Sequence, residues 1–495
     1  MASSDVVSPA ERPAREEDVR PGRVLPPPSP PNSNLGNKMV WLSGLALAAL
    51  AVFLGHGSAA PNGNCPRDWP YAPFKTEGRD IVNAKGDKVK FAGVNWPMSG
   101  ESMIPEGLEK KSASDILDDV AGLGMNFLRM GYSAQMVDEI YQAGGEDVSL
   151  EKAIIAAMGE QNGTSVVENM IKHNPKWTRE TGRFEIWSDI VKLAAERHIY
   201  VHPDMHIAKA GWCCGHADGS AWFGDEDFSV ANWTRALSYV ADWAAQHDNI
   251  VSMALVNELR QPWVENYPKF GYNWMTLVGN MTLGSDAIHK ANPDLLISWS
   301  GLQFDEDLSA LTSGTNLLSS PCYMCVSNRQ APSMDPVVFN LADHAWGDKV
   351  FYELHLYTMT EDLDMGSCGI IKAQLYRAGF NALGMDPPED CALLENHWLG
   401  PCRPASRLTP VAMTEFGTAQ DASLLSSAYI QCLREFTTEN DVSWAVWALA
   451  GSYRVRSGKQ EVDDTWALFD FNWDNWRFQE GIDKVWKPWV KATIE

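Results

Sequence analysis

IVSMALVNELR, residues 250–260, contains an apolar run of strand length that is followed by Asn257 and Glu258. A loop comes next, and residues 274–289 then show apolar positions at helical spacing. The sequence PVAMTEFG, residues 410–417, repeats this pattern, with Glu415 just after the apolar run and a helical segment further on. Strands that alternate with loops and helices are typical of a parallel β-sheet covered by helices.

Eight strand-like runs follow one another in this way. They lie at residues 91–95, 126–130, 199–205, 250–257, 295–299, 349–356, 410–414 and 442–449. Helical patterns lie between most of them, at 112–123, 185–197, 230–246, 274–289 and 423–439, and the chain ends in helical sequence. The predicted fold class is therefore α/β, a (β/α)8 TIM barrel. The alternative, an open doubly wound sheet, usually has a glycine-rich turn after its first strand, where this chain has Asn-Trp-Pro-Met.

Several segments depart from the regular alternation and predict loop insertions. A short hairpin with a turn at residues 85–87 precedes the first barrel strand, and we expect it to close the bottom of the barrel. A polar insertion that carries Asn162 precedes the helix at 185–197, and a long cysteine-containing insertion spans 358–408. Residues 301–347 show no regular pattern.

The N-terminus predicts export of the rest of the chain. Residues 1–38 are rich in Pro, Ser and charge, and we expect a disordered extension there. Residues 39–60 contain an apolar run that ends in small residues, typical of a signal peptide or an uncleaved signal anchor. The globular domain is expected at 65–495, either secreted or held by residues 39–55 with that domain outside the cytoplasm. Any contact with a membrane is expected only through this anchor.

Composition narrows the possible partners. The chain of 495 residues carries a formal net charge of -24, which would repel a phosphate backbone and argues against a nucleic-acid partner. Its 21 Trp residues fit either a large core or the stacking of indole rings on sugars. Three loop tryptophans, Trp96, Trp212 and Trp222, are candidates for either role.

The nine cysteines leave their pairing open, because connectivity does not follow from the sequence. An oxidising compartment would pair some of them, and an odd number leaves at least one thiol free or bonded to another chain. Cys322 and Cys325 form a CxxC, but no second CxxC completes a zinc site. We therefore expect no structural zinc.

Functional residues of such a barrel lie at the C-terminal ends of its strands. Six of the eight predicted strands end in an ionisable or aromatic residue. These candidates are Arg129, His206, Asn257 with Glu258, His355 with Tyr357, Glu415 and Trp447.

Glu258 and Glu415 belong to the fourth and seventh strands, which face each other across an eight-stranded ring. A carboxylate beside an apolar run is costly unless it is paired. One explanation is structural, with salt bridges to Arg129 and Arg260. The other is catalytic: Glu415, kept ionised by Arg129 and a hydrogen bond from Tyr357, attacks an anomeric carbon, and Glu258, with a raised pKa, is the acid/base. Retaining glycosidases hold two such groups about 5–5.5 Å apart.

The motifs around these residues resemble glycoside hydrolase family 5, the cellulase-like family. They are Leu-Val-Asn-Glu (255–258), His-Leu-Tyr (355–357) and Thr-Glu-Phe-Gly (414–417), within a match over most of residues 75–475. The resemblance implies a retaining barrel glycosidase that needs no metal or cofactor, with Arg129, His206, Asn257, His355, Tyr357 and Trp447 binding substrate. The substrate implied is a β-linked polysaccharide or oligosaccharide, as for a cellulase, β-glucanase or β-mannanase.

Other functions were weighed against this hypothesis. A glycolipid-cleaving glycosidase and a catalytically silent glycan-binding barrel remain as alternatives. His202, Asp204 and His206 share one face of a strand and would suit a metal, but further ligands at other strand ends are not evident. His202 is better explained as a hydrogen-bonded core histidine. A serine esterase is disfavoured because the chain lacks a Gly-x-Ser-x-Gly motif.

Overall fold

A closed barrel of eight parallel strands forms the centre of the protein, as the sequence predicted. The structure, a computed structural model, describes residues 69–98, 100–262, 271–320, 322, 325, 335–357, 368–394 and 401–495. The strands are hydrogen-bonded in the order β10-β3-β4-β5-β6-β7-β8-β9. Their bounds are β3 Ala92–Trp96, β4 Phe127–Ser133, β5 Tyr200–Ile207, β6 Ser252–Ala254, β7 Leu296–Trp299, β8 Val350–Leu356, β9 Val411–Phe416 and β10 Ser443–Val446.

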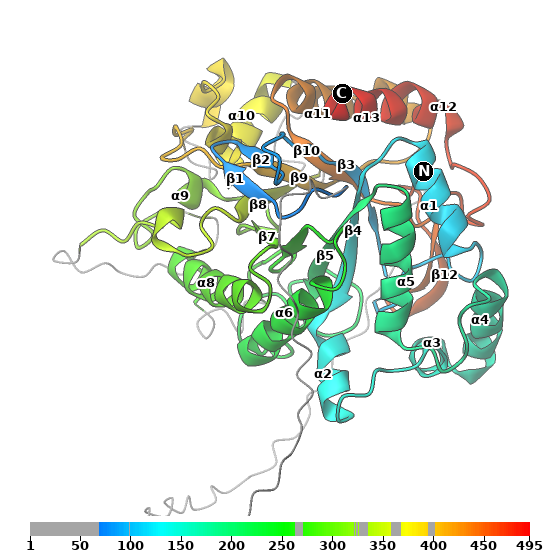
Figure 1. Cartoon of the computed structure of the whole chain (residues 1–495). Helices are drawn as coiled ribbons and strands as arrows, with labels where there is room; N and C mark the ends of the chain where they lie inside the picture. Colours follow the sequence, from blue (N-terminus) through cyan, green and yellow to red (C-terminus); the bar gives the residue numbers. More distant parts are fainter. Residues whose placement is uncertain are drawn as a thin grey trace, which may run out of the picture. The chain divides into compact units, whose positions relative to one another are not determined.

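Helices surround this ring of strands (Figure 1). The helices that follow the predicted patterns are α1 Ala113–Gly122, α5 Arg183–Glu196, α6 Val230–Ala244, α8 Trp274–Ala291, α11 Ala428–Glu439 and α13 Lys487–Ile494. Ser112 caps α1 by accepting a hydrogen bond from the backbone N–H of Asp115, which satisfies one of the free donors of the first turn. The shorter elements are α9 Ser309–Thr312, η2 Leu341–Asp343, η5 Ala422–Ser426, α12 Gln479–Gly481 and η6 Ile482–Trp486.

The insertions contain more regular structure than the sequence analysis placed there. Between β4 and α5 lie three helices, α2 Ala134–Gln142, α3 Leu150–Met158 and α4 Glu160–His173. The insertion after β8 contributes α10 Cys368–Ala378, η3 Phe380–Leu383 and η4 Glu389–Leu394. An antiparallel hairpin that was not expected, β11 Ser452–Arg456 and β12 Lys459–Asp463, follows the last barrel strand. Strand β6 is also shorter than the predicted run at 250–257.

A small hairpin closes the N-terminal end of the barrel, as expected, but its two strands turn at residues 78–79 and not at the predicted turn, 85–87. Strand β1 Lys75–Glu77 pairs with β2 Asp80–Val82, and a single bridge joins Val82 to Lys88 across the expected turn. Phe74 and Ile81 pack into a buried apolar layer at this end. Each barrel strand contributes one residue to the layer, either from the strand itself or from the position just before it: Phe91, Phe127, Tyr200, Val251, Leu296, Phe351, Ala412 and Ala445. This end is therefore filled with apolar side chains, and space for a ligand remains at the opposite end.

Close approach of the first two barrel strands requires a glycine. A Cβ at Gly93 of β3 would lie 1.9 Å from the carbonyl oxygen of Phe127 on β4. Gly93 pairs with Phe127 in the ladder, so a side chain at this position would push the two strands apart.

The predicted extension at 1–38 and the signal segment at 39–60 lie outside the described residues. Among the helices that are described, none has the length and apolar character needed to cross a membrane. The boundaries proposed for the globular domain, 65–495, stay a prediction.

Candidate active site

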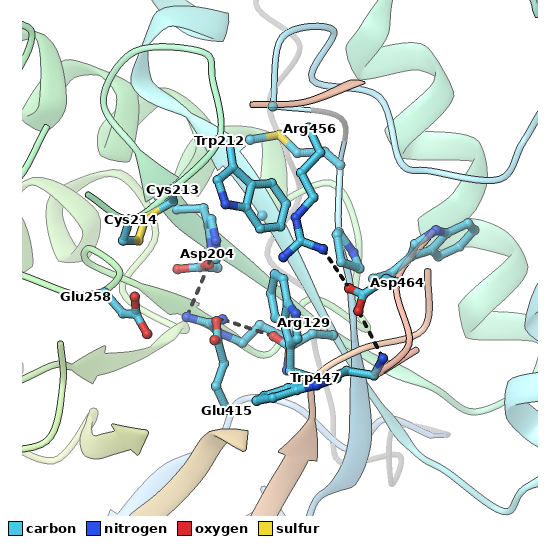
Figure 2. A pocket seen from close by; sticks show the side chains of 18 of the residues that line it. Arg129, Asp204, Trp212, Cys213, Cys214, Glu258, Glu415, Trp447, Arg456 and Asp464 are labelled. Atoms are coloured by element: carbon cyan, nitrogen blue, oxygen red, sulfur yellow. Dashed lines mark hydrogen bonds and ion pairs between the residues drawn. A yellow bond between two sulfur atoms is a disulfide. The ribbon is translucent and has the colours of Figure 1, made fainter. Parts of the chain in front are cut away.

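A cavity of about 630 Å³ opens at the C-terminal ends of the barrel strands. Six of the eight candidate residues line it: Arg129, His206, Glu258, Tyr357, Glu415 and Trp447. The other two, Asn257 and His355, are buried and contact residues that line it. Figure 2 shows the two glutamates pointing into the same space, with Arg129 beside them. Side chains separated by up to 318 positions in the chain (447 minus 129) thus meet at one site.

Arg129 is the central cation of the site. It projects from β4 with 1% of its side chain exposed. One terminal nitrogen donates to Glu415 and, at 3.0 Å, to Oδ1 of Asn95, while the other donates to Oδ1 of Asn257 at 2.9 Å and lies 3.2 Å from Asp204. A buried guanidinium needs such carboxylate and amide partners to offset the loss of water. Arg129 therefore fixes three strand-end residues relative to one another.

Glu415 is the last residue but one of β9 and is 4% exposed. Its Oε1 accepts from Arg129, and its Oε2 accepts a hydrogen bond of 2.9 Å from the hydroxyl of Tyr357. Both partners that the sequence analysis assigned to Glu415 are thus present. These two charge-assisted hydrogen bonds fix the orientation of the Glu415 carboxyl group.

Glu258 has a different environment from Glu415. Its Oε1 lies 3.1 Å from Nδ1 of His355, and 15% of its side chain is exposed to the cavity. Burial raises the pKa of Glu258, and the neighbouring cations Arg260 and His206 only partly oppose this. Its backbone has φ of 46°, and its N–H donates to Oδ2 of Asp305 at 2.8 Å, which stabilises this uncommon conformation. The two glutamates thus combine an ion-paired carboxylate with a carboxyl whose pKa is raised by burial.

The structure decides between the salt-bridge alternatives for these glutamates. Arg129 does pair with Glu415, as the structural explanation required. Arg260 instead donates to the backbone oxygen of Glu258, at 2.8 Å, and pairs with Asp218. The Glu258 carboxyl is left facing the cavity, where it can exchange a proton.

The two carboxyl groups lie close together. One oxygen of Glu258, one ring nitrogen of His355 and one oxygen of Glu415 lie within 4.8 Å of one another. Burial lowers the pKa of His355 to about 4, so its imidazole is neutral between the glutamates at neutral pH. A pair of carboxyls this close, one ion-paired with Arg129 and one with a raised pKa, can attack one atom and protonate its neighbour.

His206 and Trp447 form a second part of the cavity wall. Their rings stack with centroids 5.6 Å apart and an interplanar angle of 10°. Nδ1 of His206 lies 2.7 Å from Oδ2 of Asp204. Burial opposes the charged imidazole, but the hydrogen bond and charge of Asp204 outweigh it and raise the pKa of His206. The indole of Trp447 remains partly exposed as a flat apolar surface in the cavity.

The sequence analysis did not identify four polar residues that hold Arg129 or Glu258 in place. Asn95 and Asp204 are ligands of Arg129, and Asp305 holds the backbone of Glu258. Glu353 of β8 lies 4.0 Å from Nε of Arg129 and accepts hydrogen bonds from Ser298 and Thr414. Burial raises the pKa of Glu353 to about 7. Glu353 carried a signal in the sequence, because a charge inside the apolar run 350–356 must find partners.

The metal alternative for β5 does not fit the side chains. The carboxylate of Asp204 already pairs with Arg129 and contacts the ring of His206. A metal ion bound to Asp204 would therefore have to displace the Arg129 guanidinium. His202 is fully buried in the barrel, with Nδ1 2.7 Å from the hydroxyl of Ser252, and burial lowers its pKa to about 3. His202 is therefore a hydrogen-bonded core residue, as predicted.

The three loop tryptophans have different roles. Trp212 lines the cavity and is partly exposed. Trp222 is fully buried against Phe223 and Tyr272, and the buried indole of Trp96 donates to the carbonyl oxygen of Glu106. Trp212 thus has a ring at the cavity surface, whereas the other two indoles pack within the fold.

Eight cysteines form four disulfides in the described part of the chain. The pairs are Cys213–Cys214, Cys322–Cys325, Cys368–Cys432 and Cys391–Cys402. Cys322 and Cys325 are bonded to each other, so neither sulfur is a thiolate that could bind zinc. The first pair lines the cavity.

Comparison with known protein families identifies a related group. The family model for cellulase, glycosyl hydrolase family 5, matches residues 82–452. A glycosyl hydrolase 5 family protein of Chamaecyparis obtusa is 28% identical over 426 residues, which are 83% of this chain and 65% of that protein. An endoglucanase of Paenibacillus polymyxa is 22% identical over 186 residues, 37% of this chain and 39% of that protein. The matches thus span less than two thirds of either relative.

Solved structures share the fold. A hyperthermophilic endocellulase of the archaeon Pyrococcus horikoshii superposes with a TM-score of 0.55 at 16% identity, covering 85% of this chain and 100% of that one. A hyperthermostable endocellulase gives a TM-score of 0.57 at 16% identity, with 85% and 99% covered. At this identity the likeness concerns the barrel fold.

Proposed function

Because the chain belongs to glycosyl hydrolase family 5, the cellulase family, we propose that it is a retaining glycoside hydrolase acting on a β-linked glucan. Glu415 is the nucleophile and Glu258 the acid/base. The observation that carries this proposal is that one carboxyl oxygen of Glu258 and one of Glu415 lie within 4.8 Å of each other. Inverting enzymes hold their carboxyls about 6.5–9.5 Å apart to admit a water between them, and retaining enzymes about 5–5.5 Å.

The first step forms a covalent intermediate. An ionised oxygen of Glu415 attacks the anomeric carbon while Glu258 transfers its proton to the glycosidic oxygen, so the bond to the leaving sugar breaks. Arg129 and the Tyr357 hydroxyl orient the attacking carboxylate. The burial that raises the pKa of Glu258 supplies the protonated acid that this step needs.

The second step releases the product with its original configuration. Glu258, now ionised, removes a proton from a water molecule, and the resulting hydroxide attacks the anomeric carbon and displaces Glu415. Neutral His355, 3.1 Å from Glu258, can donate a hydrogen bond to the ionised acid at this stage.

The cavity suits an uncharged sugar chain. Trp447 and Trp212 offer flat rings to the apolar faces of pyranoses, and polar side chains lie between them. Of the relatives, one is named an endoglucanase and the solved neighbours are endocellulases, which supports a glucan rather than a glycolipid or a mannan. The roles of Asn257 and His206 as ligands of sugar hydroxyls belong to the same proposal.

The proposal is tested with the full chain and the variants Glu258→Gln and Glu415→Gln. Each variant removes the ionisable carboxyl and keeps the shape of the side chain. The wild type is expected to hydrolyse cellotetraose and an activated aryl β-cellobioside, and proton NMR should show the β-anomer as first product. Hydrolysis that survives both substitutions, or a first product of the α-configuration, would refute the assignment.

The same assay separates the alternatives. A panel of β-glucan, β-mannan and a glucosylated lipid identifies the substrate class. Binding to a glycan without turnover would indicate a silent binding barrel, for which intact Glu258 and Glu415 have no catalytic use.

We also propose that the domain lies in an oxidising compartment outside the cytoplasm. The four disulfides support this, because such bonds persist in secreted and extracellular proteins. Export would depend on residues 39–60, as a signal peptide or an anchor. Deletion of residues 1–60 is expected to abolish secretion from a eukaryotic host, and unchanged secretion would contradict this.

A further inference from the structure

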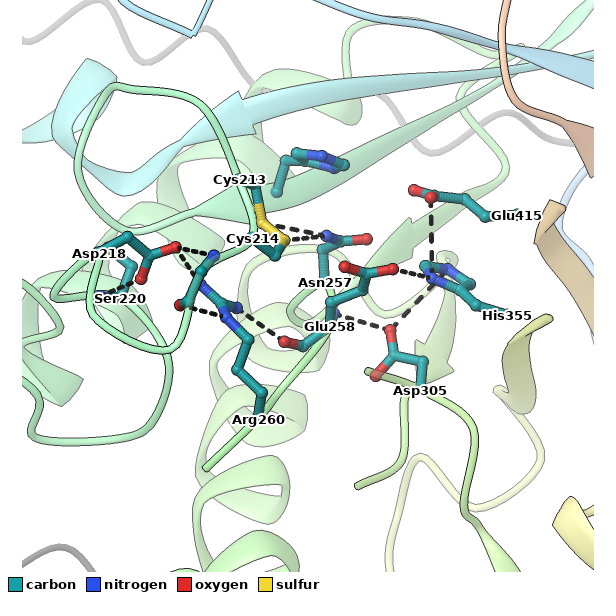
Figure 3. The surroundings of a disulfide bond; sticks show 12 residues. Cys213, Cys214, Asp218, Ser220, Asn257, Glu258, Arg260, Asp305, His355 and Glu415 are labelled. Atoms are coloured by element: carbon teal, nitrogen blue, oxygen red, sulfur yellow. Dashed lines mark hydrogen bonds and ion pairs between the residues drawn. A yellow bond between two sulfur atoms is a disulfide. The ribbon is translucent and has the colours of Figure 1, made fainter. Parts of the chain in front are cut away.

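The Cys213–Cys214 disulfide lies in the wall of the cavity, beside the proposed acid/base. It belongs to the loop that follows β5, and both cysteines line the cavity. One sulfur of each cysteine and one carboxyl oxygen of Glu258 lie within 4.8 Å of one another. Figure 3 shows the disulfide next to Asn257 and Glu258. This pair is thus a part of the site to which the two-carboxylate mechanism gives no role.

A buried arginine fixes the position of the loop that carries Cys213 and Cys214 relative to Glu258. Arg260, 1% exposed, donates from Nε to the carbonyl oxygen of Gly215 at 2.7 Å and from Nη1 to that of Glu258 at 2.8 Å. Asp218 pairs with the same guanidinium and accepts from the N–H of Gly215 at 2.9 Å. The disulfide therefore keeps a fixed position relative to the acid/base, as a contact surface for substrate requires.

The sulfurs present an apolar surface to the cavity. The amide oxygen of Asn257 is taken by Arg129, so its NH2 group faces the sulfurs, at 3.7 Å from Cys213 and 3.5 Å from Cys214. Disulfide sulfur is polarizable and a weak acceptor, which suits contact with C–H groups better than with hydroxyls. Phe304, held by a hydrogen bond from its N–H to the carbonyl oxygen of Leu259 at 3.1 Å, adds a second apolar group to the lining.

The other end of the cavity is chemically different. Arg456 of β11 stacks on the indole of Trp212, with its guanidinium carbon 4.0 Å from the ring centroid, and lies 3.4 Å from Asp464. Figure 2 shows Arg456 and Asp464 on one side of Glu415, and the disulfide with Glu258 on the other. The acid/base must lie on the leaving-group side of the scissile bond, because it protonates the departing oxygen. Since the disulfide lies beside Glu258, the leaving sugar would bind at the disulfide end of the cavity.

We propose that the Cys213–Cys214 disulfide is the contact surface for the sugar ring on the leaving-group side of the scissile bond, and so determines which leaving groups are accepted. The inference rests on the proposed function. The axial C–H face of a β-linked glucosyl ring is apolar, and its burial against sulfur is favourable in the same way as burial against a small hydrophobic side chain.

The test compares two substrates that differ in the leaving group. Cellotetraose places a sugar in the leaving position, whereas β-cellobiosyl fluoride releases fluoride, which makes no contact there. In the double variant C213A/C214A of the full chain, kcat/KM on cellotetraose should fall at least tenfold more than kcat/KM on the fluoride. The control C391A/C402A, which removes a disulfide outside the cavity lining, should leave the ratio of the two values within twofold of wild type.

Each outcome has a distinct meaning. Equal losses of kcat/KM on both substrates would overturn the inference, because the disulfide would then only position Asn257 and Glu258. Unchanged kcat/KM values on both substrates would overturn it as well. If C213A/C214A does not fold, the oxidised and phosphine-reduced wild type are compared on the same two substrates, with oxidised C391A/C402A, which keeps the Cys213–Cys214 bond, as control. Wild-type hydrolysis of neither probe would instead refute the proposed glucan hydrolase and this inference with it.

Discussion

The Tyr357→Phe substitution tests how the proposed nucleophile is held. It removes one hydroxyl, whose 2.9 Å hydrogen bond to Oε2 of Glu415 is charge-assisted, and leaves Arg129 on the other oxygen. Burial and the charge of Glu415 raise the pKa of Tyr357, so the wild-type hydroxyl remains a donor throughout the working pH range. Loss of a hydrogen bond to a charged group costs about 1.5–3 kcal/mol.

If that energy orients the nucleophile in the transition state, kcat/KM should fall about 10- to 150-fold. Steady-state hydrolysis of an aryl β-cellobioside measures this, with thermal unfolding recorded in parallel. Tyr429→Phe is the matched control: it removes a buried hydroxyl that donates to the carbonyl oxygen of Leu356, and should change kcat/KM less than threefold. A loss for Tyr357→Phe no larger than that of the control would refute the reasoning.

Three further predictions concern pH, stability and charge. Burial raises the pKa of Glu258, so the protonated acid is present below that pKa and is lost as the pH rises through it. The alkaline limb of the kcat/KM pH profile should therefore lie above the ordinary carboxyl pKa of about 4.3. An alkaline limb at the ordinary carboxyl pKa would contradict this prediction. Phe74→Ala should lower stability by about 3–5 kcal/mol in denaturant unfolding with kcat unchanged, and full stability would argue against the filled barrel bottom. Arg129→Met leaves the carboxylates of Glu415 and Asp204 buried without their cation. The free energy of unfolding should fall by about 3–5 kcal/mol in denaturant unfolding, and activity assays should show that turnover is lost. A variant that is both stable and active would disprove the central role of this cation.

The features that could be predicted from the sequence are those with a local pattern. Buried parallel strands are continuous apolar runs, and each run at 91–95 through 442–449 corresponds to a strand of the barrel. The barrel rule that places functional groups at strand C-termini then brought Glu258, Glu415 and Arg129 to one cavity. The pairing of Glu415 with Tyr357 followed from the positions of their strands in the ring.

Other parts depend on contacts that the sequence does not encode locally. Asp305 holds the Glu258 backbone from an irregular loop, and no periodicity or motif marks it. Cys368 and Cys432 are bonded partners 64 positions apart, and only the packing of α10 against α11 brings them together. Asn95 lies one residue before the end of β3 and could have been found by the same strand-end rule that selected Asn257.

The central claim, that Glu415 attacks the anomeric carbon with Glu258 as its acid/base, is tested most directly by trapping the intermediate. A 2-deoxy-2-fluoro-β-cellobioside with a good leaving group slows release of the glycosyl-enzyme, and peptide mass spectrometry locates the label. The account predicts one cellobiosyl adduct per chain, on Glu415, with none formed by Glu415→Gln. A label on Glu258 or on another residue, or turnover of the inhibitor without any covalent adduct, would contradict it.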